Sequence, residues 1–405
     1  MKQSWIKFAF YNTLRNRRRS TITVAVAALG TAAILLAGGF AYSTYEGLAQ
    51  ISARSTGHLI IGKPQHFTSD QDVPLQYGLD NAGDLKNKIL ADPAVRYVLP
   101  RIEYSGLISN GDKSTIMLAV GIDPDAEFSV KGPTLTVKEG ELIQTDSTEA
   151  EIVLGEALAR SLKARPGSSL TLMASTTDGA LNAVDVTVKG LVSTGVPDLD
   201  KRLVYSNIKT AQKLLNTQRV SSLGVFLNSM DATMPAQARL AQALPGLTVQ
   251  NWLEQAFFYK SVRDLYNRIF GALGAIISFI VVFVVANAMA MAIIERTREI
   301  GTLRAMGTLP GQLTRSFSYE GMLLGGAGAV LGAVLAISVA LLLTVFPVQM
   351  PPPPGRSSGY PLLISIDAAM YAITIFTMIA LSMLSSAVIA RKTLRQAIVD
   401  ALAHN

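Results

Sequence analysis

The chain has 405 residues, of which 49% are hydrophobic and 16% are charged, and its mean hydropathy is +0.34. This balance is too apolar for an ordinary soluble protein and too polar for a protein that lies wholly within a membrane. We therefore expect a membrane anchor joined to a sizeable water-soluble domain. Because the chain contains no cysteine, disulfides and thiolate metal sites are excluded.

The formal net charge of +7 is concentrated beside the apolar runs. Residues 46–267 carry 21 Lys and Arg against 24 Asp and Glu, whereas residues 1–19 carry six basic residues and no acidic one. Basic residues that flank membrane spans indicate topology. The charge therefore requires no nucleic-acid partner, and we expect none.

Residues 1–19 are predicted to form a cytoplasmic amphipathic basic segment, because apolar and aromatic residues recur three or four positions apart among the basic ones. An unstructured basic tail is the alternative. Residues 20–45 carry no charge and form the first predicted transmembrane helix. A signal peptide is the rival interpretation, but the apolar run is longer than a usual signal sequence and no clean cleavage site ends it.

Residues 46–267 are predicted to form a mixed α/β domain and a stalk that leads into the second span. Short alternating or apolar runs indicate strands, and wider apolar spacing indicates helices. The expected strands are residues 58–62, 95–99, 104–108, 114–120, 152–155, 169–174, 184–192, 203–205, 222–227 and 247–250. The expected helices are residues 82–90, 156–162, 208–215 and 235–243, and residues 121–124 are expected to form a turn.

Three further transmembrane helices are predicted at residues 268–294, 321–346 and 368–390. Residues 347–367 form the loop between the last two spans, and residues 391–405 form a short tail. The fold class is therefore an α-helical membrane protein with four transmembrane helices and an α/β domain inserted between the first two.

Two features of the spans predict helix packing. Asn287 is costly to expose to lipid, so we expect it to hydrogen-bond across a helix contact. Gly321, Gly325, Gly328 and Gly332 lie at intervals that leave a smooth face on the third span, which permits close packing. This face could meet a second copy of the chain or another helix of the same chain.

Residues 295–320 join the second and third spans and begin with a charged stretch. Glu295 can reach Arg298, and Arg296 can reach Glu299, at one-turn spacing in a helix. These pairs predict a short helix at the membrane surface.

The same stretch carries an apolar stripe and a stop signal. Ile300, Leu303 and Met306 are spaced to lie on one helix face. Gly307 is expected to end the helix.

The basic residues set the expected orientation. The N-terminal segment, the 295–320 loop and the C-terminal tail are richer in Lys and Arg than the 347–367 loop. Both termini are therefore expected in the cytoplasm, and the α/β domain on the opposite side of the membrane.

The chain lacks the sequence signatures of common catalytic and metal sites. It contains no G-x-x-x-x-G-K-[ST] for nucleotide phosphates and no H-E-x-x-H. One G-x-S-x-G occurs at residues 355–359, but it follows four prolines and lacks the strand–turn–helix context of a nucleophile elbow. Asp198 and Asp200 are interpreted as part of an exposed loop rather than a cation site. We therefore expect no catalytic, metal or cofactor-binding residue in this chain.

The sequence E-R-T-R-E-I-G-T-L-R-A-M-G at residues 295–307 closely resembles the cytoplasmic segment of MacB/FtsX-type ABC transporter permeases. The F-S-Y-E-G-M-L-L-G-G-A-G stretch at 317–328 and V-L-G-x-x-L-A at 153–159 fit the same family, and the domain order resembles MacB- and LolC-type permeases. The resemblance implies a coupling helix that docks on a separate ATPase. The residues that would carry the coupling are Glu295, Arg298, Glu299, Ile300, Gly301, Leu303, Arg304, Met306 and Gly307.

The resemblance also implies partners and a location. The expected partners are an ABC ATPase subunit holding ATP and Mg, a second identical or homologous permease chain, membrane lipids, and a periplasmic adaptor, lipoprotein or chaperone. The expected location is the bacterial inner membrane. The implied function is ATP-driven motion that extracts or exports a lipoprotein or another hydrophobic or peptide substrate. The alternative is an FtsX-like regulator or scaffold that controls a periplasmic partner without transport.

Overall fold

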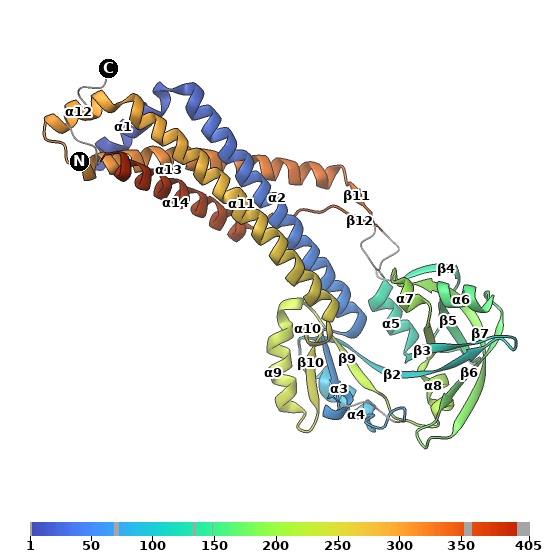
Figure 1. Cartoon of the computed structure of the whole chain (residues 1–405). Coiled ribbons are helices and arrows are strands. Elements are labelled where there is room, and N and C mark those ends of the chain that lie inside the picture. The colour runs from blue at the N-terminus through green and yellow to red at the C-terminus, as the bar shows by residue number, and fades with distance from the viewer. Residues whose placement is uncertain (1, 69–72, 133–134, 148, 352–358, 395–405) are drawn as a thin grey trace. The chain divides into compact units, whose positions relative to one another are not determined.

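The computed structural model describes residues 2–68, 73–132, 135–147, 149–351 and 359–394 (Figure 1). Most of the serine motif at 355–359 and the tail beyond residue 394 lie outside these residues. The chain divides into two compact units. One contains Met1–Glu46, Val262–Gln349 and Pro361–Asn405, and the other contains Gly47–Ser261 and Met350–Tyr360.

The first unit is built from helices. Its helices, two of which extend beyond it, are α1 (Lys2–Arg15), α2 (Arg17–Thr56), α11 (Phe257–Glu295), α12 (Thr297–Ala305), α13 (Pro310–Val345) and α14 (Ala368–Thr393). In the described part of the chain α2, α11, α13 and α14 are long and apolar enough to cross a membrane (Figure 1). The prediction of four membrane helices is met by these four elements.

The helices are longer than the uncharged runs from which the spans were predicted. α2 continues past residue 45, and α11 begins before residue 268. α13 begins at Pro310, inside the stretch 295–320 that was predicted to join the second and third spans. Proline at the first helical position loses no hydrogen bond. A helix needs no apolar side chains for its backbone hydrogen bonds, so charge patterns alone understate its length.

The glycine face of α13 packs within the chain. Gly321 and Gly325 are buried against Ser386 and Ser382 of α14, so closely that an added Cβ would clash. Gly328 and Gly332 approach α2 in the same way, at Ala27 and at the Ala28–Thr31 turn. Between the two alternatives left by the sequence, the structure therefore places this face against helices of the same chain.

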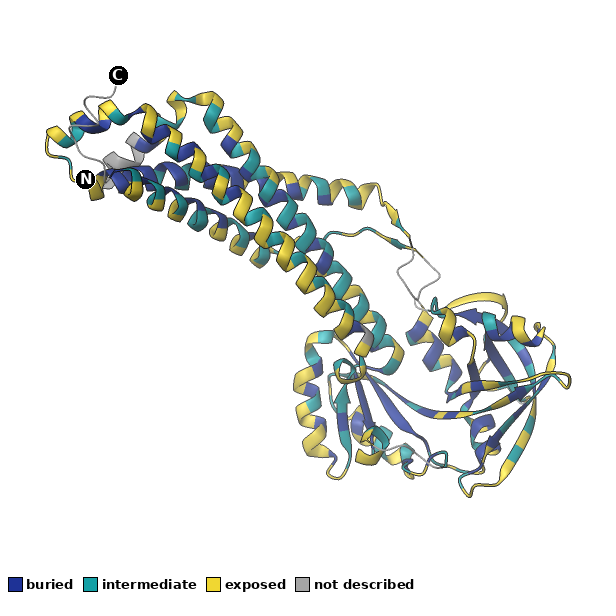
Figure 2. Cartoon of the chain, viewed as in Figure 1, coloured by how far each residue is buried: buried dark blue, intermediate teal, exposed yellow. Residues whose placement is uncertain are grey.

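Asn287 does not meet the prediction of a hydrogen bond across a helix contact within the chain. Its side chain is exposed on α11, and it has no hydrogen bond among the described residues. It belongs to a stripe of exposed residues that recur every three or four positions along α11, a helix with many exposed residues in Figure 2. The other members are Ile276, Ile280, Phe283, Met291 and Ile294.

The second unit is a mixed α/β domain built on a ten-stranded sheet with the order β10-β1-β9-β2-β3-β8-β5-β7-β4, in which β6 pairs with β2 and β7. The strands are β1 (Leu59–Gly62), β2 (Val95–Ser109), β3 (Ser114–Ile122), β4 (Thr136–Gly140), β5 (Glu151–Gly155), β6 (Ser169–Ser175), β7 (Leu181–Ser193), β8 (Leu203–Asn207), β9 (Ser222–Leu227) and β10 (Thr248–Asn251). A separate two-stranded ladder joins β11 (Gln349–Met350) to β12 (Tyr360–Pro361).

Short helices cover the sheet. They are α3 (Pro64–Thr68), α4 (Ala82–Leu90), α5 (Pro124–Lys131), α6 (Glu156–Leu162), α7 (Pro197–Asp200), α8 (Ile208–Leu215), α9 (Thr233–Ala243) and α10 (Trp252–Gln255). The main core contains Leu59, Ile102, Leu158, Leu214 and Val225, all fully buried. The predicted mixed α/β class is confirmed, and buried strands appear where period-two or continuous apolar runs predict them.

Three local predictions for this domain were wrong. The two strands expected at 95–99 and 104–108 are one long strand, β2. The turn expected at 121–124 is the end of β3 followed by α5, whose first residue is Pro124. Asp200 is not exposed: its carboxylate is buried and accepts hydrogen bonds from the hydroxyls of Ser193 and Thr194, both at 2.7 Å.

Candidate functional site

The connection between α11 and α13 turns sharply at Arg296. α11 ends at Glu295 and α12 begins at Thr297, with Arg296 between them at φ −105° and ψ 14°. At the other end of α12, Gly307 adopts φ +96°, a conformation that favours glycine, and its N–H donates to the Arg304 carbonyl at 3.0 Å. The expected helix stop at Gly307 is therefore present.

Arg296 joins three segments of the first unit. Arg296 is only 6% exposed, and its Nη1 donates to Glu320 Oε1 of α13 at 3.2 Å. Its Nη2 donates to the Asn12 carbonyl at the end of α1 at 3.1 Å, and Asn12 Nδ2 donates to the same Glu320 oxygen at 2.8 Å. The buried Arg296–Glu320 pair thus fixes the start of α12 to α1 and α13.

Two exposed ion pairs add to this attachment. Glu295 Oε2 accepts from Arg19 at 2.7 Å, and Glu299 Oε1 accepts from Arg15 at 2.8 Å. The expected pairs Glu295–Arg298 and Arg296–Glu299 are therefore wrong. The helix breaks at Arg296, and the basic residues of α1 and α2 lie closer to both carboxylates.

The predicted apolar stripe is divided between the interior and the surface. Ile300 and Gly301 are buried, and Leu303 packs partly against the same helical core. Met306, by contrast, is 76% exposed. Arg304 also turns toward the chain, since its Nη1 donates to the Leu394 carbonyl at 3.4 Å.

The outer face of α12 is open. Arg298, Thr302 and Ala305 are exposed and share one helix face. Met306 and Leu309, which is 63% exposed, follow at the end of the helix. The segment therefore has an inner face fixed to the chain and an outer face that ends in two large apolar side chains.

Sequence reasoning missed five residues that matter here. Asn12, Arg15, Arg19, Glu320 and Leu309 were not among the predicted coupling residues. Glu320 had a usable signal, because a carboxylate next to a long apolar run needs a partner. The identity of that partner, Arg296, depends on how the helices fold together.

The α/β unit holds a second cluster of buried charges, at the end of α2. Glu127 of α5 is fully buried and accepts from Arg101 Nη2 at 2.6 Å and from Lys131 Nζ at 3.0 Å. Arg101 Nη1 also donates to the carbonyl of Thr56, the last residue of α2, at 2.7 Å. Burial alone would raise the pKa of Glu127, but the positive charges of Arg101 and Lys131 outweigh it and hold the pKa below its usual value.

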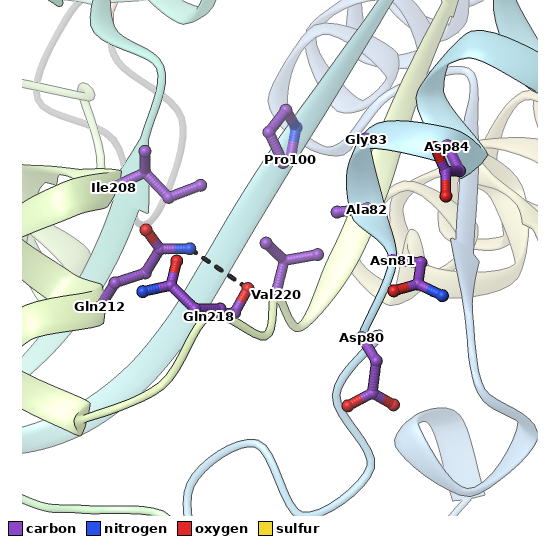
Figure 3. Close-up of a pocket in the computed structure, with 10 residues that line it drawn as sticks. All are labelled: Asp80, Asn81, Ala82, Gly83, Asp84, Pro100, Ile208, Gln212, Gln218 and Val220. Atoms are coloured by element: carbon purple, nitrogen blue, oxygen red, sulfur yellow. Dashed lines mark hydrogen bonds between the residues drawn. The ribbon is translucent and has the colours of Figure 1, made fainter.

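A shallow pocket of about 390 Å³ lies on the α/β unit beside the start of α4 and α8 (Figure 3). One wall carries Asp80, whose pKa is lowered chiefly by the hydrogen bond from Arg219, with Lys63 adding to it. The opposite wall carries Gln212, which donates to the Gln218 carbonyl at 3.3 Å. No nucleophile–base pair lies among the lining residues. In the described ranges no three His, Asp or Glu side chains gather closely enough to hold a metal ion.

Two stretches of the chain match two known families. Residues 20–243 match the MacB-like periplasmic core domain, and residues 271–398 match the C-terminal region of FtsX-like permeases. The chain belongs to the MacB/FtsX-type permease family. The sequence resemblance noted at residues 295–307 falls inside the second match, and the V-L-G-x-x-L-A stretch falls inside the first.

Curated relatives of this permease include proteins of two named systems. The chain is 26% identical over 274 residues to the lipoprotein-releasing system transmembrane protein LolE of Haemophilus influenzae, covering 65% of each chain. It is 27% identical over 252 residues to LolC of Xylella fastidiosa, covering 60% of each. It is also 32% identical over 142 residues to the macrolide export ATP-binding/permease protein MacB of Bordetella avium, covering 33% of this chain and 21% of that protein. The matches thus span less than two-thirds of the relatives' own lengths.

Proposed function

We propose that this permease is the transmembrane subunit of an ABC transporter of the MacB and LolCDE type. In this proposal a partner ATPase, which binds ATP and Mg, docks on the outer face of α12. The observation that carries the proposal is the division of α12 into a fixed inner face and an open outer face. Because α12 is fixed in this way, movement of a docked partner is transmitted to α11 and α13 and is not absorbed by bending of α12.

The substrate proposal follows the named relatives. One group of relatives carries the name lipoprotein-releasing system, and another carries the name macrolide export. We propose that movement of α11 and α2 reaches the α/β unit and extracts or exports a lipoprotein or another hydrophobic or peptide substrate. An adaptor, lipoprotein or chaperone would meet the α/β unit.

A second permease chain is proposed to cover the exposed stripe of α11. Side chains at three- and four-residue intervals are the pattern by which two helices pack along a seam. Asn287 lies in this stripe, and a polar side chain in lipid gains a partner when a second chain covers it. An identical chain or a homologous one would satisfy the same pattern.

The docking proposal predicts that Met306→Ala combined with Leu309→Ala weakens retention of the partner ATPase by roughly 30-fold. Truncated apolar anchors at an interface cost about 2 kcal/mol or more, whereas an exposed charge contributes only about 0.2–1 kcal/mol. Arg298→Ala is therefore expected to have a smaller effect. The measurement is co-purification of the ATPase with the full chain at limiting ATPase concentration.

The matched control is Leu181→Ala, which truncates an equally exposed apolar side chain on the α/β unit. This variant is expected to retain the ATPase fully. Normal retention by the Met306/Leu309 double variant, at normal expression, would rule out the outer face of α12 as the docking surface.

The proposed orientation places α12 in the cytoplasm of the bacterial inner membrane and the α/β unit in the periplasm. Because the chain lacks cysteine, single cysteines report position without background. Cysteine at Ser229 is expected to react with a thiol reagent that cannot cross the inner membrane, and cysteine at Thr302 is not. Labelling at residue 302 in intact cells would contradict the four-span topology.

A further inference from the structure

A groove of about 600 Å³ lies between the start of α13 and the end of α14. Arg315 of α13 and Arg391 of α14 both line it, and both side chains are exposed. Neither guanidinium makes an ion pair or hydrogen bond within the described residues. Among the described residues, the groove therefore presents two unpaired positive charges, whereas the charge of Arg296 is paired with Glu320.

The charges around the groove favour an anion. None of the residues lining it is acidic. The nearest carboxylate in the sequence of α13 is Glu320, which is buried and already paired with Arg296 and Asn12. An anion entering the groove would therefore meet two arginines and no carboxylate among the described lining residues.

The groove also has an apolar end. Met383 and Ala387 line it from α14, eight and four residues before Arg391. At about 1.5 Å per residue, they lie roughly 12 and 6 Å further along the helix, in the direction of the hydrocarbon core. Arg391 itself directly follows the uncharged run of α14. The groove thus changes from charged to apolar along α14, as a phospholipid does from its headgroup to its acyl chains.

Hydroxyl-bearing side chains lie between these two ends. Ser318 and Tyr319 line the groove from α13, one helical turn beyond Arg315. Tyrosine is favoured at the membrane–water interface, where its ring is in an apolar layer and its hydroxyl is near the headgroups. Ser318 is buried and its hydroxyl donates to the Thr314 carbonyl at 2.8 Å, so Tyr319 is the residue placed to meet the glycerol and ester region of a lipid whose phosphate lies at the arginines.

We propose that this groove is a binding site for an anionic phospholipid, with the phosphate between Arg315 and Arg391 and an acyl chain along Met383 and Ala387. Basic grooves between transmembrane helices at the cytoplasmic surface are suited to such headgroups. The site would fix α13 and α14 at the membrane surface close to α12. The assignment of the site to the cytoplasmic leaflet rests on the proposed orientation, but lipid binding itself does not depend on that orientation.

The experiment is a titration of the full chain in neutral detergent with phosphatidylglycerol, followed by native mass spectrometry of bound lipid. Each basic residue near an anionic lipid surface contributes about 1 kcal/mol, so Arg315→Gln and Arg391→Gln are each expected to weaken binding about fivefold. The double variant is expected to bind phosphatidylglycerol roughly 25-fold more weakly than the unaltered chain. Phosphatidylcholine, which has no net charge, is expected to bind far more weakly than phosphatidylglycerol.

Lys392→Gln is the matched control, because Lys392 is exposed beside Arg391 but does not line the groove. It is expected to bind phosphatidylglycerol like the unaltered chain. Arg315→Lys and Arg391→Lys keep the charge and are expected to bind nearly as well, which separates loss of charge from loss of folding. Glycerol 3-phosphate, which has the phosphate without acyl chains, is expected not to displace the lipid at equal concentration.

Four results would overturn the proposal. They are equal binding of phosphatidylcholine, unchanged binding by a folded double variant, displacement by glycerol 3-phosphate at equal concentration, and loss of the partner ATPase by the double variant with lipid binding intact. The last result would assign the groove to a protein interface. Cysteine labelling tests the orientation separately, so a wrong topology and a wrong lipid site give different results.

Discussion

Replacing Arg101 with methionine is expected to destabilise the α/β unit by about 3 kcal/mol or more, because a buried charge that loses its partner is costly. Glu127, fully buried, would keep only Lys131 as a cationic partner. The carbonyl of Thr56 would also lose its donor at the end of α2. The measurement is hydrogen exchange of β2 and α5 in the full chain, with the global unfolding curve as a second readout.

The matched control lies on the same strand. Arg96 is exposed on β2, so Arg96→Met is expected to change the unfolding free energy by no more than about 0.5 kcal/mol. Equal effects of the two substitutions would show that the buried cluster adds nothing beyond a surface arginine.

The same cluster predicts a pH dependence. The pKa of Glu127 is lowered in the folded state, because the charges of Arg101 and Lys131 outweigh the effect of burial. A carboxyl group of this kind stabilises the fold above its unfolded-state pKa, and this stabilisation is lost as the pH falls through the lowered folded-state pKa. Glu127→Gln is therefore expected to be less stable at neutral pH but to lose less stability on acidification than the unaltered chain.

Much of the architecture is predictable from local patterns. Uncharged runs longer than the hydrocarbon thickness mark the four membrane helices, and period-two runs mark most strands of the sheet. β4 was missed because all five of its residues are exposed and only Thr136 and Val137 favour a strand. α5 was missed because the Asp123-Pro124 pair at its start is equally typical of a turn and of a helix start.

The segment at residues 295–307 shows where sequence reasoning stops. Gly307 was predictable because a helix stop is a local property of the backbone. Whether Ile300 is buried within its own chain or exposed to a partner was not predictable, because a helical stripe has the same spacing in both cases. The ion pairs failed for the same reason: Glu299 has a suitable neighbour in sequence, but Arg15 lies closer in space.

The Arg296–Glu320 pair gives the second large effect. Arg296→Met is expected to cost about 3–5 kcal/mol of stability in the helical unit, because Glu320 would stay buried with only Asn12 as a donor. Arg15→Ala removes an exposed pair on the same segment and is expected to cost no more than about 1 kcal/mol. Thermal unfolding of the full chain in detergent measures the loss of stability caused by each of these two substitutions.

A double variant separates stability from coupling. Arg296→Met with Glu320→Met leaves no unpaired charge, and replacing a buried ion pair by apolar residues is often nearly neutral for stability. The double variant is therefore expected to unfold close to the unaltered chain and to retain the ATPase through Met306 and Leu309. If the pair transmits force from α12 to α13, ATP-dependent substrate release by the assembled complex would nevertheless fall. Full stability and full ATP-dependent activity in the double variant would show that the charges of the pair are not needed to transmit the movement. The pair would then serve only to hold α12 in place, a role that an apolar contact fills equally well.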